Sequence, residues 1–169
     1  MNLGPKSMTV RTAAVAVVSV LFAVVSAGAA TAAVAADLTG LQGSWGGQGA
    51  ATFDGGSKES MRCNGYYKGE GDALSMVIKC ASAGGAKIEL RGQLTGKDGA
   101  VSGTWEERTY NASGSVSGSS EPGALKVAID GGISGTMSVS FTEKSQTVAI
   151  ATTGGSLRTV NISFNRDRE

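Results

Sequence analysis

The residues with the clearest chemistry are the two cysteines, Cys63 and Cys80, which lie at equal distances from the dipeptide Gly71-Asp72. A two-residue hairpin turn at this dipeptide would pair Glu70 with Ala73, and each step outward would bring the next two residues opposite each other. Seven steps out, Cys63 faces Cys80. Pair types alternate along an antiparallel ladder, so this pair is of the type in which facing side chains lie closest. The spacing therefore predicts a disulfide between adjacent strands.

Metal binding is the other chemistry that two cysteines can offer. The chain contains no histidine and no second pair of cysteines. A structural zinc site needs about four such ligands. The sequence therefore favours the disulfide over a metal site, and we expect neither a metal nor a cofactor.

The carboxylates are the remaining candidates for catalysis, because histidine, the commonest general base, is absent. Most of them fall at expected turns, where a solvated charge is the usual role. Glu107 is the exception, because two residues after Trp105 it can fall on the inward face of a strand. We interpret this position as a strand that frays or bulges, not as a buried working acid. We expect no enzymatic activity. The carboxylates considered are Glu70, Asp72, Glu106, Glu107, Asp130 and Glu143.

The first 36 residues have the composition of a secretory signal peptide. Lys6 and Arg11 are their only charges, a long Ala- and Val-rich stretch follows, and Ala33-Val34-Ala35-Ala36 provides small residues for cleavage. An uncleaved anchor is the alternative, because residues 12–36 are long enough to span a bilayer. We expect cleavage, leaving one domain over residues 37–169 in the periplasm or outside the cell and without a membrane span. That compartment also favours the disulfide.

The charge balance of this domain gives little reason to expect a polyanionic partner. It keeps 13 of the 15 basic residues and all 14 acidic ones, which makes its net charge −1. A mixed, nearly neutral surface attracts neither nucleic acid nor lipid headgroups. We expect a monomer.

Alternating apolar residues and frequent turn signals predict an all-β fold of about ten strands. Turns such as Asp98-Gly99 and Pro122-Gly123 recur every eight to twelve residues. Strands that follow each other through short turns form an antiparallel meander, and closing it into a small barrel removes the sheet edges. The expected strands cover residues 41–53, 60–69, 73–82, 86–94, 100–108, 111–119, 124–130, 132–141, 146–152 and 156–165.

The alternation also predicts which face of each strand is buried. Apolar residues such as Ile78 and Val127 fall on one face, and serine, threonine and charged residues on the other. An outer-membrane barrel has the opposite arrangement, with a polar lumen, and fits the pattern less well. Glycines on the inward face would allow the strands to coil sharply. They are Gly43, Gly47, Gly49, Gly65, Gly92, Gly103 and Gly135.

The triplet Gly43-Ser44-Trp45, preceded by Leu38-Thr39-Gly40-Leu41, opens the first expected strand. In this segment and in strand number the chain resembles the calycins, which include lipocalins and avidins. The resemblance implies that Trp45 lies across the closed end of a small barrel, although no C-terminal helix of the lipocalin kind is readable. The chain as a whole resembles small secreted β-proteins of alphaproteobacteria, a group without an assigned activity.

The inward aromatic residues are the candidates for contact with a ligand, with core packing as the competing role. We expect a non-catalytic binding protein that holds a small apolar ligand inside the barrel. The alternative is a protein-interaction module, such as a periplasmic protease inhibitor. A solid core would favour the alternative, whereas an internal void would favour the ligand. The candidate ligand-lining residues are Trp45, Tyr67, Trp105, Phe141 and Phe164.

Overall fold

The computed structural model describes Met1, Gly4 and residues 38–168. The predicted signal peptide, apart from Met1 and Gly4, and its cleavage site lie outside the described residues, so export stays a prediction. No helix among the described residues is long and apolar enough to cross a membrane.

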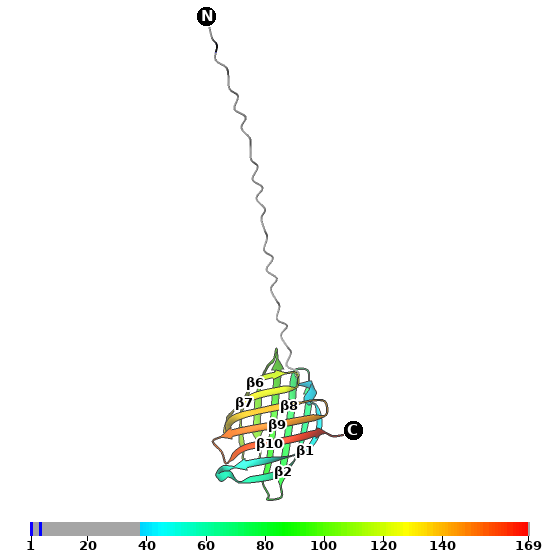
Figure 1. Cartoon of the computed structure of the whole chain (residues 1–169). Helices are drawn as coiled ribbons and strands as arrows, with labels where there is room; N and C mark the ends of the chain where they lie inside the picture. Colours follow the sequence, from blue (N-terminus) through cyan, green and yellow to red (C-terminus); the bar gives the residue numbers. More distant parts are fainter. Residues whose placement is uncertain (2–3, 5–37, 169) are drawn as a thin grey trace. The chain divides into compact units, whose positions relative to one another are not determined.

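Ten antiparallel strands form a closed barrel, as predicted (Figure 1). Each strand pairs with the next along the chain, and the first pairs with the last. One 3-10 turn, η1 (Thr39–Leu41), precedes the barrel and another, η2 (Asp54–Gly56), joins the first two strands. The strands are β1 (Gly43–Phe53), β2 (Lys58–Glu70), β3 (Ala73–Ser82), β4 (Lys87–Lys97), β5 (Ala100–Glu107), β6 (Ala112–Glu121), β7 (Ala124–Gly131), β8 (Ser134–Phe141), β9 (Ser145–Thr153) and β10 (Leu157–Arg166).

The register between β2 and β3 is the one that the cysteine spacing predicted. Glu70 lies opposite Ala73, and Cys63 lies opposite Cys80. The two cysteines form a disulfide, with their Cα atoms 4.1 Å apart. Gly71 in the connecting turn has a φ of 57°, which glycine adopts without steric cost. The predicted disulfide and its hairpin are therefore confirmed.

The core fills the inside of the barrel, and the predicted alternation of faces is found in each strand, although Gly43 at the start of β1 is exposed. Trp45, Trp105 and Ile78 are buried within it. The outer positions of β6 to β9 carry mainly serine, threonine and alanine side chains, as in the alternating burial of β8. The first strand begins later than predicted, because Leu41 belongs to η1 and β1 starts at Gly43, and several other strand ends differ from the prediction by one to three residues. The fully buried side chain of Leu41 lies in the core cluster.

Some inward glycines lie so close to the neighbouring strand that no side chain fits. A Cβ atom on Gly103 would lie 2.0 Å from the carbonyl oxygen of Gln93. The obstructing atom belongs to the backbone, which moves only if the strand pairing changes. These glycines therefore allow the strong coiling that closes the barrel.

We expect Gly103→Ala to lower the free energy of unfolding by about 1–3 kcal/mol, the usual cost of overpacking. Gly132→Ala is the matched control, because its Cβ would come no closer than 3.5 Å to its neighbours. Urea unfolding of both variants would measure the difference. Equal stability of the two variants would contradict this explanation of the glycine.

Candidate functional site

One end of the barrel, where β1 begins and β10 ends, is sealed around Trp45. The indole is fully buried, and its Nε1 donates a hydrogen bond to the carbonyl oxygen of Leu41 at 2.9 Å. The Arg166 guanidinium lies over the indole, 4.2 Å from the ring centroid. It also donates to the carbonyl oxygens of Gln42, Gly40 and Glu143, so β10 is tied to both η1 and the β8–β9 turn. This arrangement matches the position that the calycin resemblance implied for Trp45.

The other predicted aromatic residues of this half are packed against each other. The rings of Tyr67 and Phe164 and the side chain of Trp45 surround the inward-facing Gly65. Phe141 lies against Gly40 of η1. The structure therefore places four of the five candidate ligand-lining residues in the sealed half of the barrel.

A buried polar pair crosses this apolar half. The Gln146 side-chain amide donates to the Tyr67 hydroxyl at 2.7 Å, and both side chains are buried. The Gln146 Oε1 atom has no hydrogen-bond partner among the described residues. Burial raises the pKa of the Tyr67 phenol far above its usual value, and the hydrogen bond from Gln146 lowers it by less.

This pKa shift predicts a loss of stability in alkaline solution. The unfolded chain releases the Tyr67 proton near pH 10, whereas the folded protein retains it. Above about pH 10 the unfolded state therefore binds fewer protons, and the free energy of unfolding falls by up to about 1.4 kcal/mol per pH unit. Below that pH the contribution of Tyr67 is constant. Urea unfolding at several pH values from 9 to 11 should give a shallower decline for Tyr67→Phe, and identical slopes would contradict the prediction.

The opposite half of the barrel contains a partly open cavity of about 50 Å³. Trp105 lines it, the one member of the predicted aromatic set that does so. The indole Nε1 of Trp105 donates to the carbonyl oxygen of Asp130 at 3.3 Å. The walls are otherwise almost entirely apolar, with contributions that include Met76, Leu90, Val116, Ile133, Met137 and Ile150.

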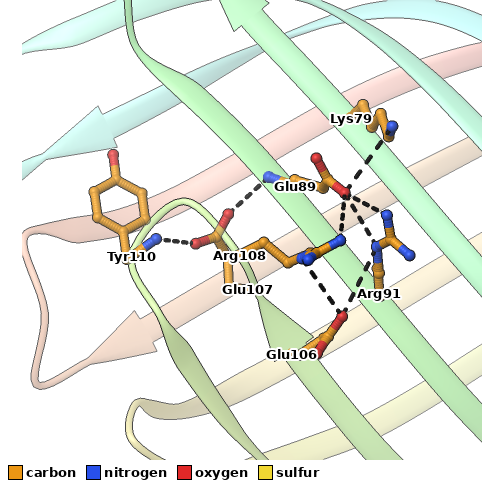
Figure 2. Close-up of polar contacts among 7 residues, drawn as sticks. All are labelled: Lys79, Glu89, Arg91, Glu106, Glu107, Arg108 and Tyr110. Carbon is orange, nitrogen blue, oxygen red and sulfur yellow. Dashed lines mark hydrogen bonds and ion pairs between the residues drawn. The ribbon is translucent and has the colours of Figure 1, made fainter.

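Glu107 also lines this cavity, and it corrects the sequence-based interpretation. β5 neither frays nor bulges there, because Glu107 continues the register opposite Leu90 and Ala112. Its side chain is only 6% exposed. One carboxylate oxygen accepts the backbone N–H of Glu89 at 2.7 Å, and the other accepts that of Tyr110 at 2.6 Å (Figure 2). The alternation of inward and outward residues along β5 indicates that Glu107 faces inward. The two backbone N–H partners of its carboxylate cannot be read from the sequence.

A group of ion pairs lies on the outer face of the same strands (Figure 2). Glu89 pairs with Arg91 at 2.7 Å and with Lys79 and Arg108 at 4.0 Å. Glu106 pairs with Arg91 at 3.8 Å and with Arg108 at 3.9 Å. The hydrogen bond from Arg91 is the main cause that lowers the pKa of Glu89. These cations thus face the two outer carboxylates, and no ion pair joins a described cation to Glu107.

The described residues contain no group of three or more histidine, cysteine, aspartate or glutamate side chains placed to hold a metal ion. The cavity lined by Trp105 and Glu107 is the candidate site for a ligand, because small-molecule sites are mostly apolar concave pockets.

A closed ten-stranded meander with one end sealed by an N-terminal 3-10 turn has a calycin-like barrel fold. No protein-family model matches the chain, and no curated protein sequence matches it. Among solved structures it is similar to Rv2717c from M. tuberculosis, with a TM-score of 0.58 and 16% identity over 78% of this chain and 95% of that one. It is also similar to the S-type phycobiliprotein lyase CPES from Guillardia theta, with a TM-score of 0.52 and 12% identity over 78% and 90% of the two chains. At these identities the likeness shows the fold alone.

Proposed function

We propose that this chain is an exported, non-catalytic binding protein that holds a small apolar molecule in the cavity beside Trp105. The observation that carries the proposal is a cavity with apolar walls inside an otherwise packed barrel. Apolar cavities in proteins accept small apolar guests. The disulfide and the signal-like composition of residues 1–36 support export.

The cavity volume limits the size of the ligand. Drug-sized ligands occupy pockets of about 300–1,000 Å³, whereas this cavity measures about 50 Å³. At roughly 10–15 Å³ for one water-sized sphere, it holds a molecule of about four non-hydrogen atoms. Such a ligand gains at most about 1.5 kcal/mol per atom, so its Kd should be no tighter than about 40 µM. A lipid chain is too large for this volume.

Two cavity-lining methionines make the proposal testable by NMR. With methyl-13C methionine in the purified protein, xenon and 1-propanol should shift the methyl signals of Met76 and Met137 saturably. Met61 is buried but lies outside the cavity wall, so its signal is the internal reference. Val116→Ile should weaken binding by filling the cavity. If no saturable shift appears with either probe, the binding proposal is wrong and the interaction module becomes the better hypothesis.

A further inference from the structure

We propose that the outer face of the barrel binds an acidic saccharide, a chain of hydroxylated rings that carry carboxylates. This surface lies outside the cavity, so the proposal goes beyond the proposed function and does not rest on it. It is carried by two adjoining hollows on neighbouring strands, which share Arg62. One hollow presents mainly neutral hydrogen-bonding side chains, and the other presents mainly cations.

The first hollow, of about 560 Å³, lies over β10, β1 and β2, which are neighbours in the barrel (Figure 1). Gln48 of β1 lies opposite Arg62 on one side and Ser163 on the other. Asn64 and Asn165 lie two residues further along β2 and β10. These five side chains are exposed, and none of them has a side-chain hydrogen bond or ion pair within the described part of the chain. Their donors and acceptors are therefore available to a ligand.

The types of these side chains indicate what the ligand offers. Each carboxamide group both donates and accepts hydrogen bonds, as a sugar hydroxyl does. The Arg62 guanidinium has a planar set of donors that matches a carboxylate with two parallel hydrogen bonds. A hydroxylated ring with one carboxylate would satisfy both kinds of group, with its carboxylate at Arg62.

The second hollow, of about 250 Å³, continues from Arg62 over β3 and β4. Lys79 and Lys87 line it together with Arg62. Glu89 supplies a carboxylate to this hollow, but Arg91 already lies 2.7 Å from that carboxylate, whereas Lys79 is 4.0 Å away. Arg62 and Lys87 have no ion-pair partner among the described residues. The local charge is therefore positive although the domain is nearly neutral, and it would attract the carboxylate of a second ring.

The other end of the first hollow suits the uncharged part of a saccharide. The Asp167 carboxylate lies beside Gly46, 2.9 Å from the position that a Cβ atom would take there. It can accept a hydrogen bond from a hydroxyl group, but it repels an anion. Tyr66, two residues after Asn64 on the same face of β2, is 48% exposed and offers a ring for packing against a sugar. The bound chain should therefore have one direction, with its carboxylates toward Arg62.

The test titrates 15N-labelled protein with trigalacturonate at pH 7 and low salt. The side-chain NH2 signals of Gln48, Asn64 and Asn165 should shift saturably, whereas that of Asn111, in the turn after β5, should not. The methyl ester of the same trisaccharide keeps the hydroxyls but has no charge. It should bind at least about tenfold more weakly, because hydrogen bonds to charged groups contribute more than neutral ones. Inorganic sulfate, which has charge without hydroxyls, should also bind more weakly.

Two variants test the role of Arg62. Arg62→Gln should weaken the binding of trigalacturonate at least about tenfold and should leave the binding of its methyl ester nearly unchanged. Arg62 is exposed, so its replacement leaves the core untouched. Lys126→Gln is the matched control, because it removes the same charge from the outer face of β7, where the cross-strand neighbours are Ser119 and Ser138. It should leave the affinity as in the wild-type protein.

Each contrary outcome overturns a stated part of the proposal. Equal affinities for trigalacturonate and its methyl ester would overturn the role of the charge. An equal loss of affinity in the two variants would show a general charge effect and overturn the site at Arg62. Sulfate binding as tight as that of trigalacturonate would overturn the saccharide as the ligand, and unshifted NH2 signals would overturn the whole proposal. None of these outcomes affects the cavity, whose ligand is tested with xenon and 1-propanol.

Discussion

Trp45→Ala is expected to lower the free energy of unfolding by about 3–5 kcal/mol, the usual cost of removing a large buried aromatic side chain. Trp45 is fully buried and is joined to η1 by its hydrogen bond to Leu41. Its removal would also leave Arg166 without the ring beneath it. Urea unfolding followed by far-UV circular dichroism would measure the loss, because this signal does not depend on Trp45 itself.

Two further variants separate the contributions of the Trp45 indole N–H and of the Arg166 guanidinium to the stability of this end of the barrel. Trp45→Phe keeps an aromatic ring but loses the indole N–H, and it should cost less than the alanine variant. Arg166→Lys keeps the charge but cannot reach the carbonyl oxygens of Gln42, Gly40 and Glu143 with one planar group. It should therefore destabilise the protein measurably. A loss below 1 kcal/mol for Trp45→Ala would show that the sealed end contributes little to stability.

Removal of the disulfide by the double substitution Cys63→Ala and Cys80→Ala is expected to cost about 3 kcal/mol. The bond closes a loop with a sequence separation of 17. In the chain-entropy model a loop of about this length contributes roughly 3 kcal/mol, by restricting the unfolded chain. The measurement is urea unfolding of the double variant beside the wild-type protein.

A thiol assay provides the control for this prediction. The unfolded, unreduced wild-type chain should give no reactive thiol, because the described residues contain no free cysteine. Reduction before unfolding should lower the stability of the wild-type protein to that of the double variant. Two reactive thiols per unreduced chain would contradict the prediction.

The site was only partly predictable, because a period of two identifies the buried face of a strand but not the position of a residue along the barrel. Trp45, Tyr67 and Trp105 were all correctly assigned to the inside. The structure packs Trp45 and Tyr67 into the sealed half and leaves the cavity beside Trp105. Which half of the barrel is filled by side chains depends on how side chains from all ten strands pack together. The residue pattern of a single strand does not contain that information.

Local rules of the chain determined the architecture by themselves. Alternation fixed the strands and their faces, and the equal spacing of Cys63 and Cys80 around Gly71-Asp72 fixed one register to the residue. Only the tertiary structure showed that Glu107 is buried at the end of a regular strand. Its carboxylate oxygens accept the backbone N–H groups of Glu89, on the neighbouring strand β4, and of Tyr110, in the turn after β5. A strand pattern reports only which way a side chain points, whereas the cost of burying a charge depends on the groups that surround it in space.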